Sequence, residues 1–236
     1  MGVCSPAFAQ FPSADRYYPL DHTVRPGVVG QWNESIHNVR VQRGPVFQPI
    51  RVEMPVEADV TIYDGPSRRP IELGTPAQAT LMVGPVYRLK ISNLKDLPGV
   101  ELYPSVELID RLHPPPGRSA AYPVPIGFTE QELQFAMDGR LVTKVVYLEQ
   151  PNRAYSASTA EATTPRLAMR GENALQLADE RGRPMAIVRL GGRLPDIHDR
   201  EADFFGMGAP VRAAVSRAAR EVSRGQSTVS RSLLEE

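Results

Sequence analysis

The most constraining feature of the chain is a series of short runs, rich in β-branched and aromatic residues, between residues 46 and 92. Within each run apolar and polar residues alternate, which is the period of a half-buried strand. Asp64-Gly65, Gly74-Thr75-Pro76 and Gly84-Pro85 supply turn signals between them. The runs span residues 46–54, 58–63, 79–83 and 86–92. Short strands with turns every eight to twelve residues or so predict a mainly β protein with a β-sandwich core.

The last of these runs shows the alternation most clearly. Arg88 and Lys90 are expected to face solvent, and the residues between and beside them to face the core. The expected core positions are Tyr87, Leu89 and Ile91.

Proline supports a β protein rich in loops. The chain has 23 prolines in 236 residues, about twice the average usage, and proline disfavours helix interiors and central strands. Further strands are expected within residues 100–112, with Pro104 at an edge or bulge, and at residues 141–149.

Two segments carry helix signals. Thr129 and Glu132 match a capping box, and Gly139 is placed to end that helix. Residues 173–181 predict a second short helix between Asn173 and Gly182, with a β-hairpin turning at residues 179–182 as the alternative. A strand at residues 185–190 follows in either case.

A third segment, residues 211–222, has small apolar residues at helical spacing. It predicts a flexible C-terminal helix that orders only when docked, since so short a helix is marginal alone. We expect the core to keep its melting temperature without residues 204–236. The helix would expose Arg212, Arg217, Arg220 and Arg224.

These signals divide the chain into six parts. The expected parts are a signal-peptide remnant (1–9), an extended N-terminal arm (10–40), a β-sandwich domain with one inserted helix (41–150), a linker (151–165), a small α/β appendage (166–200) and a flexible tail with a short helix (201–236).

The first residues predict export. Ala7 and Ala9 match the A-x-A pattern that signal peptidase recognises, so the mature chain is expected to begin at Gln10. Because charged and apolar stretches precede such a site, the native gene is expected to extend upstream of Met1. Cys4, the one cysteine, precedes the cleavage point, which leaves a mature chain without disulfide, thiolate nucleophile or Cys-ligated metal.

The composition argues against nucleic-acid binding, and the hydropathy pattern argues against a transmembrane helix. Lys+Arg and Asp+Glu both total 27, so no overall positive charge favours nucleic acid. No apolar run is long enough for a transmembrane helix.

Residues 58–65 form an expected strand that ends in Asp-Gly, the Gly74-Thr75-Pro76 turn follows, and residues 84–89 form an expected strand after a glycine. With these motifs residues 55–94 resemble a PEGA-type module, a small Ig-like β unit of bacterial envelope proteins, which implies that the β-sandwich core is Ig-like. The resemblance also implies an envelope-facing structural or binding module and brings no catalytic residues.

The sequence offers few candidates for chemistry, and no catalytic residue or cofactor is predicted. No two histidines have the i, i+4 spacing of a helical zinc site, and no nucleophile-elbow motif is present. One polar cluster could bind a divalent ion, against the alternative of a solvated loop. Its candidate ligands are Asp196, His198, Asp199 and Asp203.

Candidate partner-binding residues are one tryptophan and several arginines. Trp32 could contact a sugar or partner, or instead anchor the arm to the core. Arg189 and Arg193 could clamp a carboxylate on one face of an extended segment, or form salt bridges with Glu101, Glu107 or Glu149. The tail adds Arg212, Arg217 and Arg220.

The function predicted from these observations is a secreted or periplasmic, non-enzymatic structural or interaction module of the bacterial envelope, with an envelope or cell-surface protein as partner. The alternatives are a β-sandwich that binds a glycan or small ligand, and a metal-dependent enzyme that uses the Asp196–Asp203 cluster.

Overall fold

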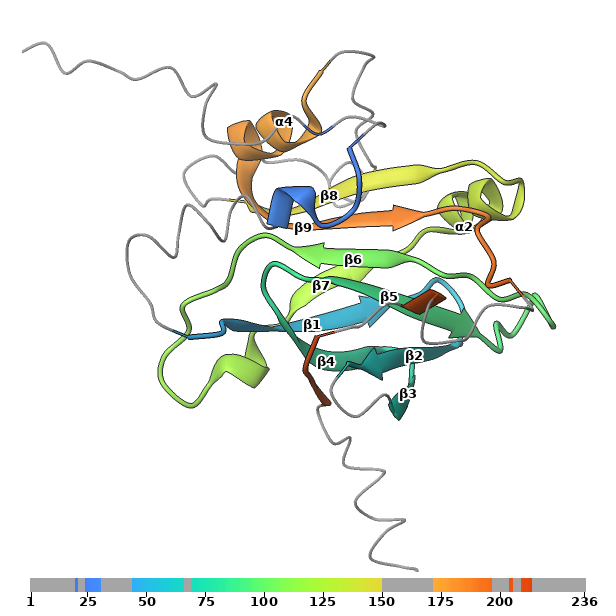
Figure 1. Ribbon diagram of the computed structural model, residues 1–236, viewed down its shortest axis with the longest axis horizontal. Helices are drawn as coiled ribbons and strands as arrows, with labels where there is room; N and C mark the ends of the chain where they lie inside the picture. Colours follow the sequence, from blue (N-terminus) through green and yellow to red (C-terminus); the bar gives the residue numbers. More distant parts are fainter. Residues whose placement is uncertain are drawn as a thin grey trace, which may run out of the picture.

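The computed structural model describes residues 20, 24–30, 44–65, 69–149, 172–196, 204–205 and 209–213. These residues form two β-sheets with few helices (Figure 1). The prediction of a mainly β sandwich with a short helix is confirmed. An Ig-like arrangement stays a prediction.

The first sheet has the strand order β10-β4-β1-β7. Strand β1 pairs antiparallel with β4 and parallel with β7, and β10 adds antiparallel to β4. The strands are β1 (Phe47–Glu53), β4 (Ala77–Met82), β7 (Val124–Gly127) and β10 (Val211–Ala213).

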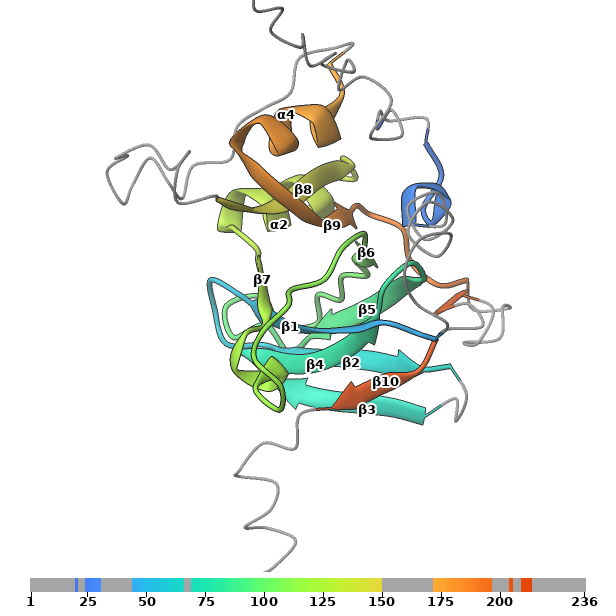
Figure 2. The ribbon, with the colours of Figure 1, turned by 90° about the vertical axis from the view of Figure 1, so that its left-hand side faces the viewer.

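The second sheet has the order β3-β2-β5-β6-β9-β8, and every neighbouring pair is antiparallel. The strands are β2 (Asp59–Asp64), β3 (Arg69–Gly74), β5 (Val86–Ser92), β6 (Ser105–Leu108), β8 (Val142–Glu149) and β9 (Gly182–Leu190). Figure 2 shows β1 and β4 beside β2 and β3, with β8, β9 and α4 at the other end of the molecule.

One continuous apolar core contains side chains of both sheets. The alternation expected in β5 is confirmed, because Tyr87, Leu89 and Ile91 are buried and the residues between them are not. Other members of the core include Ile50, Val52, Leu81 and Ile126 from the first sheet and Val60, Ile62, Val106 and Val188 from the second.

Helix α2 (Glu130–Met137) begins as predicted. The Thr129 hydroxyl accepts from the Glu132 backbone N–H, and the Glu132 carboxylate accepts from the Thr129 N–H, which satisfies two donors that a helix start leaves free. Gly139 follows the helix with φ +77°, a conformation that favours glycine.

Helix α4 (Ala174–Arg181) is also confirmed, and the hairpin alternative is wrong. The Asn173 side chain accepts from the Leu175 N–H, and β9 begins at Gly182 directly after the helix. A 3-10 turn, η2 (Ser119–Ala121), precedes β7. Among the described residues no helix is long and apolar enough to span a membrane.

Two expectations need correction, and one strand was not expected. The appendage at residues 166–200 is not separate, because β9 lies inside the second sheet between β6 and β8. The tail helix expected from Val211 is wrong at its start, because Val211–Ala213 form β10, where β4 satisfies their backbone groups. Strand β3 was not predicted, because Pro70 and nearby polar residues favour a turn.

Two parts of the proposed division, the signal-peptide remnant and the linker, lie wholly outside the described residues. Most of the N-terminal arm and most of the tail lie outside them as well.

Candidate functional site

The outer face of the second sheet carries a row of polar residues. The strand register places Arg88 of β5 opposite Ser105 of β6, and Ser105 opposite Arg189 of β9. Their chain neighbours Tyr87, Val106 and Val188 belong to the core between the sheets. Because strand neighbours point to opposite faces, the row lies on the side away from the core.

An aromatic cluster covers the Arg88 end of this face. Phe204 and Phe205 are buried against Tyr103 and Tyr63. The rings of Tyr63 and Phe205 stack with centroids 3.8 Å apart, and Tyr103 meets Phe204 edge-on at 5.1 Å. These contacts attach the C-terminal part of the chain to β2 and to the segment before β6.

Two arginines lie against Phe204. The guanidinium carbons of Arg88 and Arg193 are 4.5 and 5.6 Å from the centre of its ring, within the range of a cation–π interaction. Arg88 also donates a hydrogen bond to the Phe204 carbonyl oxygen. Arg193 is exposed on the loop after β9, whereas Arg88 is half-buried.

This arginine pair is electrostatically unfavourable. Burial and, to a smaller extent, the positive charge of Arg193 lower the pKa of Arg88. Every ion pair formed among the described residues involves other side chains. Among the described residues, Arg88 and Arg193 therefore present positive charge with no carboxylate paired to them.

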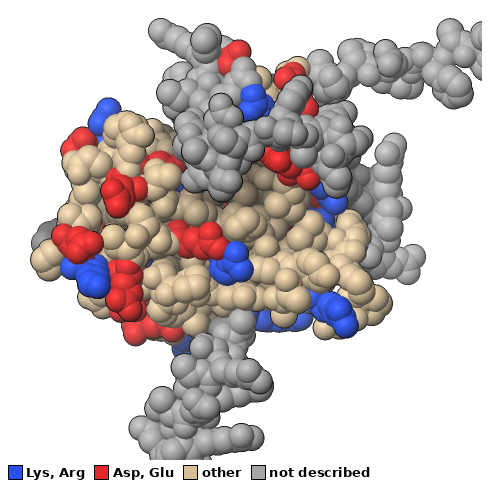
Figure 3. All heavy atoms as spheres, turned by 180° about the vertical axis from the view of Figure 1, so that it is seen from behind, with Lys and Arg blue, Asp and Glu red and all other residues tan. Residues whose placement is uncertain are grey.

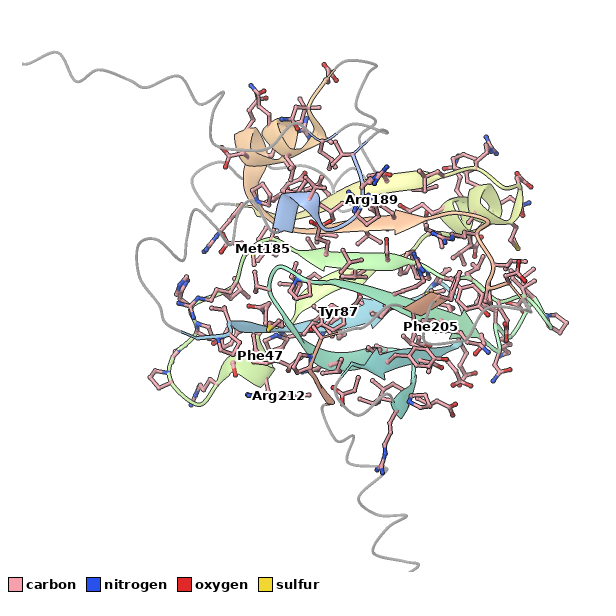
Figure 4. The ribbon with its side chains drawn as sticks, viewed as in Figure 1. Phe47, Tyr87, Met185, Arg189, Phe205 and Arg212 are labelled. Carbon is pink, nitrogen blue, oxygen red and sulfur yellow. The ribbon has the colours of Figure 1, made fainter. Side chains whose placement is uncertain are left out.

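Arg189 differs because it is already paired with a buried carboxylate. Its Nη1 lies 3.1 Å from Glu107 Oε2, and the Glu107 side chain is completely buried. Glu107 also accepts hydrogen bonds from the backbone N–H groups of Gly27 at 3.0 Å and Gly30 at 2.5 Å. Figure 4 shows Arg189 beside residues 24–30, and Phe205 nearer the opposite end of the sheet.

One donor of this buried pair is left over. Arg189 Nη2 is buried and has no hydrogen-bond partner in the part of the chain that the structure describes. An unsatisfied buried donor costs about 1–3 kcal/mol, so the pairing of Glu107 with Arg189 and residues 24–30 is not fully optimised.

A second, partly buried ion pair lies near α2. Lys144 Nζ contacts both Glu132 carboxylate oxygens, at 3.0 and 2.8 Å, and the Gly127 carbonyl oxygen at 2.5 Å. Burial lowers the pKa of Lys144, while Glu132 opposes that shift. Because its donors are used within the fold, Lys144 holds α2 against β8.

The predicted arginines thus separate into three environments. The salt bridge between Arg189 and Glu107, one of the pairings considered, is confirmed, and the clamp of Arg189 with Arg193 stays a prediction. Arg193 belongs to the pair at Phe204. Arg212 stacks on Phe47, 4.2 Å from the ring centre, and Figure 4 shows the two together.

The described residues do not form the predicted metal cluster. Asp196 is the one candidate ligand inside the described residues, and within them no group of three metal-binding side chains occurs. His198, Asp199 and Asp203 lie outside the described residues, as do Trp32, Arg217 and Arg220.

Sequence reasoning missed the role of Arg88. Its position on β5 predicted a solvent-facing side chain, but nothing local indicated that Phe204 and Arg193 would meet it. Only the sheet register and the return of the chain at residue 204 bring these three residues together.

The wider surface is mixed in charge. Viewed from behind, acidic and basic side chains are interspersed on broad uncharged areas (Figure 3), in line with the formal net charge of zero. On that face, attraction of a charged partner depends on local groups and not on a general field.

Comparison with known proteins adds no relative: no protein-family model, curated protein or solved structure matches the chain. The resemblance of residues 55–94 to PEGA-type modules stays a prediction.

Proposed function

We propose that this chain is an exported, non-enzymatic interaction module of the bacterial envelope that binds an acidic group of a partner protein through Arg88 and Arg193. The observation that carries the binding part is the position of two guanidinium groups against one ring, Phe204, without a carboxylate partner among the described residues.

A carboxylate is the ligand that this pair fits best. Guanidinium groups offer planar, paired donors that match the two oxygens of a carboxylate. Burial and, to a smaller extent, repulsion from Arg193 lower the pKa of Arg88, and a carboxylate placed near both arginines would offset the repulsion. The exposed Arg193 makes the site accessible, and partial burial of Arg88 strengthens its attraction for a negative charge.

The fold contains a matched control for this site. Arg140 is exposed and lies 3.9 Å from the centre of the Phe135 ring, but it has an ion pair with Asp138 at 3.2 Å. Both Arg140 and Arg193 therefore stack on a phenylalanine ring. Among the described residues, Arg140 has an acidic partner and Arg193 has none.

Binding of a capped hexaglutamate peptide, measured by isothermal titration calorimetry, tests the proposal. We expect Arg193→Gln to weaken binding about tenfold, which corresponds to one charged contact of about 1.4 kcal/mol. Arg140→Gln should leave it unchanged, and rising salt should weaken it. Equal affinity of wild type and Arg193→Gln, or equal losses in both variants, would contradict the proposed site.

Export is tested separately. The pattern around Ala7 and Ala9 supports cleavage before Gln10. Protein isolated from the envelope fraction of its native cells should give Gln10 as the first residue in N-terminal sequencing. Recovery of the chain from the cytosol with Met1 intact would refute export and leave the carboxylate site to be judged by calorimetry.

A further inference from the structure

We propose that the Glu107 site is a peptide-docking site, occupied in this structure by the chain's own residues 24–30 with Leu20, and that the same segment of a second copy also occupies it. This inference goes beyond the carboxylate site, which uses other residues at Phe204.

The site recognises backbone groups through a buried carboxylate. Glu107 accepts from the N–H groups of Gly27 and Gly30, about 80 positions away in the chain. A carboxylate binds such donors strongly when water is excluded. Because Arg189 balances the negative charge of Glu107, this carboxylate can lie buried in the sheet and still accept hydrogen bonds from a docked segment.

The docked segment meets a strict steric requirement. A Cβ at Gly30 would lie 2.3 Å from the carbonyl oxygen of Gly84, so no side chain fits there without movement of the backbone. Gly27 has φ +92°, which glycine adopts most easily. An occupant therefore needs glycine at both positions, as in Gly27-Val28-Val29-Gly30.

Two apolar side chains complete the recognition. Leu20 and Val29 are buried in a cluster with Ile109, Leu175 and Ile187. The Leu20 N–H also donates to Asn173 Oδ1 at 3.1 Å, the oxygen that caps α4. Figure 1 shows residues 24–30 close to α4 and β9.

A second copy is the occupant that the site fits, because it carries the same glycines, leucine and valine. None of the contacts named above requires the segment to belong to the same chain. Residues 31–43 join the docked segment to β1 and could span up to roughly 45 Å when extended, which is enough to reach a neighbouring molecule. Exchange of an identical element is a low-cost route to a dimer.

Arg189, whose Nη1 binds Glu107, has in Nη2 a buried donor without a partner among the described residues, and this favours reversibility. A docked state with an unsatisfied donor is less stable than one in which every polar atom is bonded. The segment can therefore leave and be replaced.

The test uses full-length proteins and a fluorescent peptide of residues 20–30. In wild type the attached segment competes at a millimolar effective concentration, as is usual for a short linker. Gly30→Ala should displace the attached segment and bind the free peptide at least tenfold more tightly than wild type does. Gly44→Ala is the matched control, because a Cβ at Gly44 meets nothing within 4 Å.

A mixing experiment tests the second copy directly. Gly30→Ala has a free site and Glu107→Gln a free segment, so the mixture should form a heterodimer by light scattering while each variant alone stays monomeric. If either variant fails to fold, wild type should show a concentration-dependent dimer that excess peptide dissociates.

Peptide affinity that is equal in wild type, Gly30→Ala and Gly44→Ala would overturn the proposal, as would a monomer in every mixture. Arg193→Gln should not alter peptide binding, so failure here is distinguishable from failure of the carboxylate site.

Discussion

The hydroxyl of Tyr87 donates a hydrogen bond of 2.9 Å to the carbonyl oxygen of Pro210, 123 positions later in the chain. The same hydroxyl accepts from the Met82 backbone N–H at 2.9 Å. One core side chain of β5 thereby joins the last strand of the first sheet to the body of the fold.

Replacement of Tyr87 by phenylalanine is expected to lower the free energy of unfolding by about 1–3 kcal/mol at pH 8, because two hydrogen bonds are lost and buried space is kept. Urea denaturation measures this directly. An unchanged midpoint would mean that water replaces the hydroxyl at no cost.

The advantage of tyrosine should disappear at alkaline pH. Burial raises the pKa of Tyr87 from 10.0 to about 12. A group whose pKa is higher in the folded state contributes its full stability below the unfolded pKa and loses it as pH rises through the folded one. The stability gap between wild type and Tyr87→Phe should therefore shrink between pH 10 and pH 12. A constant gap across that range would contradict the assignment.

Truncation after residue 203 is expected to lower the melting temperature, contrary to the expectation from the sequence. It removes Phe204 and Phe205, the acceptors for Arg88 and Tyr87, and β10. A chain that ends after Ala213 keeps all of these contacts and is the control. Equal melting temperatures of the two truncated chains would restore the original expectation.

Thr129→Ala should lower the free energy of unfolding by about 1 kcal/mol, the usual value of a helix cap. Thr129→Ser keeps the hydroxyl acceptor for the Glu132 N–H and should restore most of the loss. Thermal unfolding of both variants checks this, and equal losses would show that the Thr129 methyl group matters and not the cap.

The ion pairs Glu107–Arg189 and Asp110–Arg183 should contribute differently to the free energy of unfolding. Glu107→Ala leaves Arg189 buried without its partner, a loss of about 3–5 kcal/mol. Asp110→Ala removes a two-point contact with Arg183 whose side chains are 25% and 39% exposed, so its effect should stay near 1 kcal/mol. Equal losses in chemical denaturation would mean that burial does not govern these pairs.

Features that depend on residues close together in the chain could be predicted from the sequence. The Thr129–Glu132 capping box and the alternation through Tyr87 and Leu89 depend on residues a few positions apart, so the chain itself displays them. The pairing of Arg189 with Glu107 was among the options because both side chains lie on expected strands.

Long-range placement was not predictable in the same way. Val211–Ala213 carry a helical period, but the free edge of β4 offers backbone partners and they form a strand. Likewise nothing near Gly27 or Gly30 indicates that Glu107 accepts their N–H groups, or that Phe204 returns to Arg88. These contacts depend on the register of the whole sheet.

The position of β9 has a consequence for biosynthesis. It lies between β6 and β8 although it follows both in the chain, and among the described strands β8 pairs with β9 alone. During translation β8 must wait about 40 residues for its neighbour, roughly two to eight seconds at ordinary elongation rates. Until Leu190 leaves the ribosome the second sheet stays open at β6. The order of the strands thus makes closure of the second sheet one of the last steps in the synthesis of the described part of the chain.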